Sequence, residues 1–407
     1  MRALVEVNVP ACGYGTITLT EAARVLDSKS FPLDWRTEHP DELVLENEHL
    51  RATFDRHTCA LVSLVDKART VPGTNPDFTG INPRAMGELI RPGQAAVFRR
   101  IQEDDRLGMT AWTVGRYMQV QPLTDKVRLL KLDRSGTLRQ SLTYEVMTGP
   151  SKLTATFWLD ADSHRLEVAA DCDWHEIGRR GEGVPQFNFY LPLAYPCRAY
   201  RYDIPFGSID RAPLALDVPA NSWGAALPQD ESLPPVQLIT EANYGFRGVD
   251  DSLALTLIRS SWEPDPYPEL GMHKIRFAIQ VAQASANKQE LIRSAYDYTH
   301  PLEVFSGAGT QPSRFSFLSL ESGTVALSAV KAPEDGDCRE LILRVYETEG
   351  QETQAVLRFD RKIELARWVD THEQPVEDSQ PLSVEGERLS FSLGAGRLGS
   401  VWVRMEN

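Results

Sequence analysis

The sequence predicts an all-β fold, with a large antiparallel β region followed by a smaller C-terminal β-sandwich. Three observations support this class. Apolar residues alternate with polar ones in successive segments that polar turns separate. Convincing helical periodicity is limited to one stretch near residue 290. The chain has 407 residues, 42% of them hydrophobic, which is enough for two or three packed domains.

The clearest strands lie in the middle of the chain. In 153-LTATFWL-159 every second residue is apolar, and 166-LEVAADCDW-174 repeats the pattern after the turn 160-DADSH-164. Such a hairpin buries one face and exposes the other to water. Similar strand pairs are predicted at 43–55 with 60–67, at 341–347 with 355–359, and at 389–393 with 400–405.

These segments divide the chain into four predicted parts. Residues 1–38 form lead-in strands and a connector, and residues 39–285 form the large β region. Residues 286–312 contain one short helix, 286-ANKQELIRSAYDY-298, followed by a linker that contains Pro and Gly. Residues 313–407 form the small C-terminal β-sandwich.

Charge, hydropathy and cysteine usage exclude several classes of partner. The net charge is -14 and no Lys/Arg stripe is present, so we expect no nucleic-acid partner. No apolar run approaches the roughly 18 residues of a membrane span. The N-terminus lacks the basic and then apolar pattern of a signal peptide. Five widely spaced cysteines without a CxxC pair predict reduced thiols and a cytoplasmic location.

The stretch 171-DCDWHEIG-178 is the best candidate for acid/base chemistry. Asp173, His175 and Glu176 offer a base, an imidazole and an acid within four positions. Hydrolysis of a glycoside needs two carboxylates that face each other across the substrate, about 5 to 9.5 Å apart, and neighbours on one strand do not. We interpret these residues as solvated carboxylates and a hydrogen-bonded histidine at a strand end. A mutarotase-like epimerase that acts through His175 and Glu176 is a further alternative.

No other motif predicts catalysis or metal binding. Eight histidines are scattered without an HxH or HExxH pair, and neither a GxSxG elbow nor a GxxxxGK[ST] phosphate loop is present. The Gly-rich run 393-LGAGRLGS-400 lies between two predicted strands, which favours a hairpin turn. We therefore predict no catalytic residue, metal ligand or cofactor site in this chain.

Two loop-like segments combine aromatic residues with polar ones. They are 110-TAWTVGRY-117 and the Pro-rich 260-SSWEPDPYPELGMHK-274. Sugars stack on aromatic rings while a few polar groups hold their hydroxyls, and proline excludes a central strand from the second segment. The predicted substrate-binding residues are Trp112, Tyr117, Trp262, Asp265 and Tyr267.

Several segments resemble glycoside hydrolase family 38, the α-mannosidases. The hairpin 45-LENEHLRATFDRHTCALVSLVDKA-68 is similar to the opening of the family's β half, and 166-LEVAADCDWHE-176 to its VDWHE strand. The lead-in 8-NVPACGYGTITL-19 resembles its VPALGY-type strand. The most specific likenesses are 257-LIRSSWEPDPYPELGMHKIRFAI-279 and 330-VKAPEDGDCRELILRVYETEGQ-351.

The resemblance implies a C-terminal, non-catalytic half of a retaining α-mannosidase, whose large region is a galactose-mutarotase-like supersandwich. The nucleophile, the acid and the ligands of zinc or another divalent metal would belong to a separate N-terminal catalytic domain or subunit. This chain alone is then expected to be inactive and to help bind an α-mannoside or oligosaccharide. Two family motifs differ here, because Thr110 and Thr113 replace aspartates, and Glu269, Leu270 and Gly271 replace a DRG turn.

A stand-alone carbohydrate-binding module is the alternative function. It would use Trp112, Tyr117, Trp262 and Tyr267 as a stacking platform, without a catalytic partner.

Overall fold

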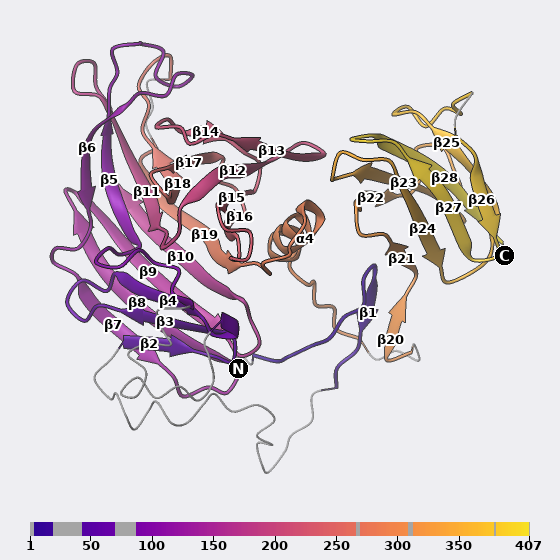
Figure 1. Cartoon of the computed structure of the whole chain (residues 1–407), viewed down its shortest axis with the longest axis horizontal. Coiled ribbons are helices and arrows are strands. Elements are labelled where there is room, and N and C mark those ends of the chain that lie inside the picture. Colours follow the sequence, from indigo (N-terminus) through magenta and orange to yellow (C-terminus); the bar gives the residue numbers. More distant parts are fainter. Residues whose placement is uncertain are drawn as a thin grey trace.

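Two sandwiches of antiparallel strands make up the molecule in a computed structural model, which describes residues 4–18, 43–69, 87–265, 269–307, 312–377 and 380–406. The larger one lies at the left of Figure 1 and the smaller one at the right, with the helix α4 (Lys288–Thr299) between them. The predicted all-β fold class is confirmed.

The large sandwich consists of two stacked sheets. The nine-stranded sheet has the order β13-β12-β15-β16-β19-β10-β9-β8-β7, and the six-stranded sheet the order β14-β17-β18-β11-β5-β6. The first comprises β13 (Gly207–Arg211), β12 (Cys197–Ile204), β15 (Trp223–Pro228), β16 (Val236–Thr240), β19 (Gly271–Val281), β10 (Arg165–Trp174), β9 (Ser151–Asp160), β8 (Arg139–Thr148) and β7 (Arg128–Asp133). The second comprises β14 (Val218–Pro219), β17 (Gly245–Val249), β18 (Ser252–Arg259), β11 (Val184–Pro192), β5 (Val97–Glu103) and β6 (Tyr117–Pro122).

Alternation along the strands explains why these two sheets stack. In β10 the residues from Leu166 to Trp174 are buried at every second position, as predicted, and β9 pairs beside it. On the inner face of the six-stranded sheet, the rings of Phe98 of β5 and Phe187 of β11 stack 5.4 Å apart. Phe189 meets Phe277 of the opposite sheet at 4.9 Å. Burial of this shared apolar layer is the main force that holds the sheets together.

A three-stranded sheet covers one end of this core. It contains β2 (Leu43–Glu46), β3 (Leu50–Phe54) and β4 (Leu61–Asp66), followed by a short 3₁₀ helix at Lys67–Arg69. Its Phe54 ring packs edge-on against Phe157 of β9, 5.1 Å away. The hairpin predicted at 43–67 is therefore an extension of the large core.

The small sandwich consists of two four-stranded sheets with their own core. One sheet has the order β21-β24-β27-β26 and the other β22-β23-β28-β25. Their strands are β21 (Leu318–Glu321), β24 (Thr353–Phe359), β27 (Arg388–Leu393), β26 (Leu382–Glu385), β22 (Val325–Lys331), β23 (Glu340–Glu347), β28 (Leu398–Met405) and β25 (Ile363–Val369). Gly394 and Gly396 lie where the chain passes from β27 to β28, but these two strands belong to different sheets, as do β23 and β24. The strand pairs predicted at 389–393 with 400–405 and at 341–347 with 355–359 are therefore wrong, because each connection crosses from one sheet to the other.

The predicted helix is present as α4 (Lys288–Thr299) and joins the two sandwiches. Asn287 caps its N-terminus by accepting a hydrogen bond from the Glu290 backbone N–H, and the Glu290 carboxylate accepts one from Asn287 in return. Its buried stripe, Leu291, Ile292 and Ala295, packs in one cluster with side chains of both sandwiches. The helix is therefore a shared structural joint.

The lead-in segment contributes one short strand among its described residues, where a pair was expected. This strand, β1 (Gly13–Gly15), pairs with β20 (Arg314–Ser316), which follows the linker after α4. A Cβ on Gly13 would lie only 2.0 Å from the Phe315 carbonyl oxygen, so the close approach requires glycine. The partner strand lies about 300 residues away, which no local pattern could reveal.

Candidate functional site

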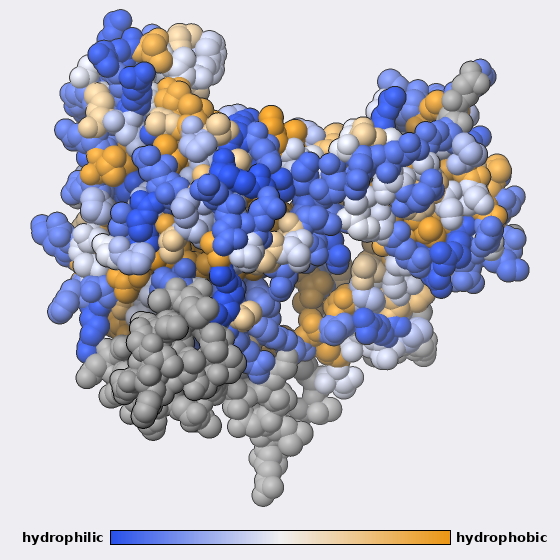
Figure 2. Space-filling view, viewed as in Figure 1, coloured by the Kyte–Doolittle hydropathy of each residue, from blue (hydrophilic) through white to orange (hydrophobic). Residues whose placement is uncertain are grey.

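Three loops converge at one end of the large sandwich, at the upper left of Figure 1. They are the β5–β6 loop (104–116), the β10–β11 loop (175–183) and the described start of the β18–β19 loop (260–265). The Ala111 N–H donates to the Glu263 carbonyl at 2.7 Å, and the Gly181 N–H donates to the Asp105 carboxylate at 2.6 Å. Apolar patches interrupt the polar surface at this end in Figure 2. We call this region the loop end.

A buried ion pair anchors the β5–β6 loop. Arg259, the last residue of β18, donates from Nε and Nη2 to the carboxylate of Glu103, with distances of 2.9 to 3.2 Å. The same guanidinium also donates to the carbonyls of Thr110 and Thr113. Glu103 is fully buried, and burial raises the pKa of its carboxyl group while Arg259 opposes that rise. Arg259 therefore clamps the loop that carries Trp112 to the end of the sheet.

A second polar network covers the outer face of the six-stranded sheet. The Asp217 carboxylate accepts hydrogen bonds from Tyr117 at 2.8 Å, Gln186 at 2.7 Å and Thr256 at 3.0 Å. Arg247 lies 3.4 Å from the same carboxylate, and its guanidinium stacks 3.9 Å above the Tyr117 ring. Burial raises the pKa of the Tyr117 hydroxyl above its usual range, so this group acts as a neutral donor. The network fixes the start of β6, directly after the clamped loop.

The structure brings four of the five predicted substrate-binding residues to this region. Trp112 is 74% exposed at the tip of the clamped loop. Trp262 is half-buried, and its ring lies against the backbone of Gly178. Asp265 is exposed nearby, whereas the Tyr117 ring is covered by Arg247 and its hydroxyl is engaged by Asp217. Tyr267 lies outside the described residues.

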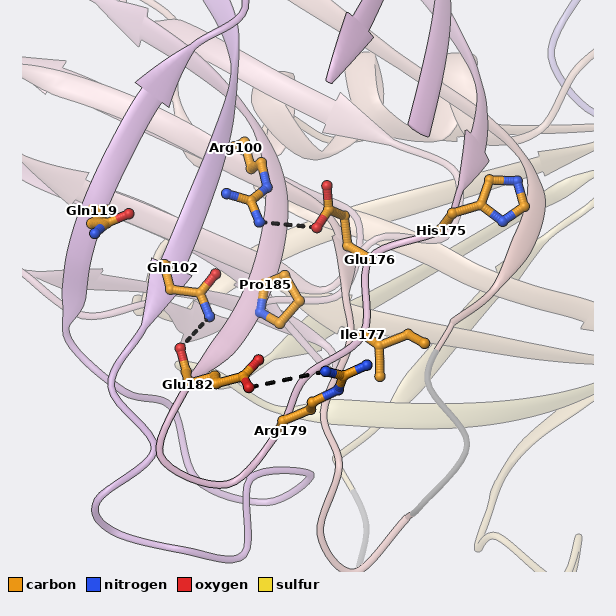
Figure 3. A pocket seen from close by; sticks show the side chains of 9 residues that line it. All are labelled: Arg100, Gln102, Gln119, His175, Glu176, Ile177, Arg179, Glu182 and Pro185. Carbon is orange, nitrogen blue, oxygen red and sulfur yellow. Dashed lines mark hydrogen bonds and ion pairs between the residues drawn. The ribbon is translucent and has the colours of Figure 1, made fainter. Parts of the chain in front are cut away.

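A polar hollow of about 440 Å³ opens beside these loops, at the mouth between the two sheets (Figure 3). Its walls are Arg100 and Gln102 of β5, Gln119 of β6, and the segment after β10; the lining comprises Arg100, Gln102, Gln119, His175, Glu176, Ile177, Arg179, Glu182 and Pro185. Figure 3 shows the Glu176 side chain reaching toward Arg100, with which it forms an ion pair at 2.9 Å.

The structure contradicts one expectation for residues 171–178, namely that Glu176 is solvated. Glu176 is buried and ion-paired, whereas we had expected a solvated carboxylate; a side chain from β5, 76 residues earlier, neutralises it. His175 does lie at the strand end as expected, with Nε2 3.0 Å from the Asp173 carboxylate. Its ring points away from Glu176 in Figure 3. The geometry therefore does not bring His175 and Glu176 together as the acid/base pair of an epimerase.

Two features are absent from the described parts of the chain. Over those residues, no three His, Cys, Asp or Glu side chains come together in a way that could hold a metal ion. The same residues include no helix long and apolar enough to cross a membrane.

Two family models match the sequence. The model described as "Glycosyl hydrolases family 38 C-terminal domain" matches residues 45–267, more than half of the chain. The chain belongs to glycosyl hydrolase family 38. A second model, "Glycosyl hydrolases family 38 C-terminal beta sandwich domain", matches residues 324–395, within the small sandwich. The resemblance found in the sequence is confirmed.

Relatives of this family 38 chain are α-mannosidases. Human alpha-mannosidase 2C1 is 24% identical over 96% of the chain, and the alpha-mannosidase of Saccharomyces cerevisiae is 21% identical over 84%. The chain spans 36% and 32% of the lengths of these two proteins. A family 38 structure from Enterococcus faecalis has the same fold, with a TM-score of 0.66 and 12% identity over 89% of this chain and 44% of that one.

Sequence reasoning found the aromatic loops but missed the charged side chains beneath them. Glu103, Arg259, Asp217 and Arg100 are distant in sequence, and no spacing rule connects them. The one available signal was Arg259, which ends a strand of otherwise largely apolar residues. A charge at such a position needs a partner when it is buried.

Proposed function

We propose that this family 38 chain is the non-catalytic C-terminal portion of an α-mannosidase. It packs against a separate catalytic portion, which holds the nucleophile, the acid and a divalent metal such as zinc, and it completes the mannoside site. One observation carries the proposal: both matching models describe C-terminal domains, and the chain spans about a third of its α-mannosidase relatives. The expected role is therefore structural support of the site and binding at its rim.

Exposed apolar side chains support the existence of a packing partner. The linker after α4 presents Leu302, Val304 and Phe305 to solvent, and the last two are 91% and 83% exposed. In Figure 2 apolar surface is visible between the two lobes, where this linker runs in Figure 1. Apolar side chains gathered at the surface mark interaction sites. We assign this linker to the interface with the catalytic portion.

The loop end supports the proposed role at the rim of the site. Arg259 holds the carbonyls of Thr110 and Thr113, so the exposed Trp112 between them is presented on a fixed backbone. A sugar that stacks on such a ring loses little affinity to loop ordering. Trp112 thus has the exposure and the support that a contact to a mannoside leaving group requires.

Two measurements test this proposal. The purified chain is assayed on an aryl α-mannoside with zinc or cobalt, and we expect no turnover above background. The chain is then mixed with the catalytic portion of an α-mannosidase from the same source, and we expect a stable complex by size-exclusion chromatography. A Val304→Ser/Phe305→Ser variant should weaken the complex, whereas Leu365→Ser, an exposed apolar residue of β25, serves as the matched control. Turnover by the chain alone, or equal complexes with all variants, contradicts the proposal.

A stand-alone carbohydrate-binding module is the second candidate, because Trp112 is a largely exposed ring on an anchored loop. Titration with mannobiose, followed by tryptophan fluorescence, separates the two functions. Saturable binding that Trp112→Ala abolishes, in a chain that forms no complex with a catalytic portion, would favour the module.

The absence of disulfide bonds among the five cysteines is consistent with a cytoplasmic location. All five cysteines are free, and burial raises the pKa of Cys172 to about 12, which keeps this thiol protonated and unreactive. We therefore retain the cytoplasm as the proposed compartment, which localisation of a tagged chain in cells would test.

A further inference from the structure

We propose that Arg99 of β5 and Arg247 of β17 form a binding site for a carboxylate group on the outer face of the six-stranded sheet. Arg99 lies opposite Asn188 of β11 and donates from Nε to its Oδ1 at 3.1 Å. The Asn188 amide also donates to the Tyr117 hydroxyl at 3.2 Å, and the Arg247 guanidinium stacks 3.9 Å above the Tyr117 ring. The two arginines therefore reach the same part of this face from different strands.

The free edge of Arg99 has the shape that a carboxylate requires. Among the described residues, neither Nη1 nor Nη2 has a hydrogen-bond or ion-pair partner. Unlike the buried Nε of Arg100 on the same strand, these two nitrogens are open to solvent. Two Nη groups can donate parallel hydrogen bonds to the two oxygens of one carboxylate. The Tyr190 ring, 4.0 Å from the guanidinium, and the bond to Asn188 hold it in place, so binding needs little ordering.

One positive charge on this face is not balanced. Asp217 lies 3.4 Å from Arg247 and already accepts the three further hydrogen bonds described above. Glu103, the other buried carboxylate of this face, is paired with Arg259. No described acidic side chain forms an ion pair with the partly buried Arg99. Burial lowers the pKa of the Arg99 guanidinium, and the charge of Arg247 also lowers it. A partly buried cation without a counter-ion is unfavourable, and a bound monoanion would remove that cost.

The same arrangement decides between classes of ligand. A neutral sugar would leave the excess charge in place, and a cation would add to it. A group with two or more negative charges would create an excess of the opposite sign. A carboxylate carries one charge and two coplanar acceptor oxygens, which match the unbalanced charge and the free edge of Arg99. Such a group can belong to a small acid, for example a uronic acid, or to an acidic side chain of a protein that packs on this face.

Titration of the whole chain with sodium acetate and sodium glucuronate tests the site. Glucose is the neutral control, and sodium chloride keeps the ionic strength constant so that screening does not change. The reporter is the nuclear magnetic resonance signal of the Asn188 side-chain amide, because Asn188 contacts Arg99 and is present in every variant. We expect a saturable shift with a dissociation constant on the order of 10 mM for either acid, and no shift with glucose.

Three variants locate the binding. Arg99→Met should raise the dissociation constant at least tenfold, because the two parallel hydrogen bonds are lost, while circular dichroism confirms the fold. Arg99→Lys keeps the charge but lacks the fork, so it should weaken binding severalfold. Arg367→Met is the matched control, since Arg367 also stacks on an aromatic ring, that of Trp402 at 4.3 Å, but lies in the small sandwich. It should leave the titration unchanged.

The complex with a catalytic portion separates the two sources of the carboxylate, and this arm alone rests on the proposed function. A shift that acetate still causes in the complex assigns the site to a small acid. Loss of that shift in the complex, together with a weaker complex of Arg99→Met, assigns it to a carboxylate of the partner.

Two results overturn the proposal. One is an Asn188 signal that does not saturate up to about 200 mM acetate or glucuronate, with a complex that Arg99→Met leaves unchanged. The other is equal binding by Arg99→Met and the unchanged chain. If no variant forms a complex at all, the proposed function fails, whereas the titration of the chain alone still decides whether the site exists.

Discussion

Replacing Arg259 by methionine should destabilise the large sandwich more than any substitution of a surface charge. The guanidinium contacts both oxygens of the fully buried Glu103 and two loop carbonyls, so Arg259→Met leaves a buried carboxylate with only Gly115 and Gln186 as donors. Removal of one member of a buried ion pair costs about 3–5 kcal/mol. We expect a loss of this size in the free energy of unfolding, together with faster opening of the 104–116 loop.

Two comparisons separate the charge from the lost hydrogen bonds. In Arg259→Met/Glu103→Gln the unpaired carboxylate is absent, so the cost should fall to about 1–3 kcal/mol. The destabilisation caused by Arg259→Met alone should also depend on pH. Burial raises the pKa of Glu103 in the folded state. A carboxyl group with a raised pKa stabilises the fold at low pH, and this contribution is lost as the pH rises through the folded-state pKa. Without Arg259 that pKa rises further, so the cost should be larger at about pH 8 than at about pH 5.

Hydrogen exchange is the suitable assay, because two sandwiches need not unfold in one step. Amides of β5 and β11 report the opening of the large sandwich alone. Arg128→Met is the matched control, since Arg128 pairs with Glu145 on the surface and is 68% exposed; it should cost at most about 1 kcal/mol. Equal effects of the two single variants, or a double variant as destabilised as Arg259→Met, would refute the clamp.

Three further substitutions have defined outcomes. Glu347 accepts hydrogen bonds from four backbone N–H groups, of Glu349, Gly350, Gln351 and Gly396, so Glu347→Ala should destabilise the small sandwich by about 2–4 kcal/mol in thermal unfolding. Burial raises the pKa of Asp203 to about 6, so its contribution is lost as pH rises from about 4 to above 6; Asp203→Asn should flatten that dependence in urea titrations. A Cβ on Gly248 would lie 2.2 Å from the buried Tyr200 ring, so Gly248→Ala should lower the free energy of unfolding by about 2 kcal/mol or more in the same titration. Gly350→Ala is the control for steric clash alone, because a Cβ on Gly350 would meet no atom within 4 Å, although its positive φ still disfavours alanine.

The elements of the fold could be predicted from the sequence wherever a local periodic pattern of apolar residues defines them. The strands at 153–159 and 166–174 followed from strict alternation, and α4 from its apolar stripe. These signals are local because each face of a strand or helix meets one environment. The strands at 389–393 and 400–405 were also found, but their predicted pairing was wrong, because alternation does not tell which sheet a strand joins.

The candidate site could be predicted only in part, because its interacting side chains come from segments far apart in the sequence. Trp112 and Trp262 were recognisable as aromatic residues in loops, but the pair of Glu103 with Arg259 joins residues 156 positions apart. Glu176 looked solvated because a strand end is usually exposed, and its burial depends on Arg100 from another sheet. A single sequence gives the type of each side chain but not its distant partner.

The ribbon of β1 and β20 has a consequence for the order of events during synthesis. Tyr14 pairs with Phe315, so the first strand leaves the ribosome roughly 300 residues before its partner exists. At about 5–20 residues per second that interval lasts on the order of 15–60 s, and the large sandwich can form meanwhile without this strand. β1 therefore stays unpaired until β20 has emerged, and a nascent chain arrested near residue 300 should still expose this strand to proteases.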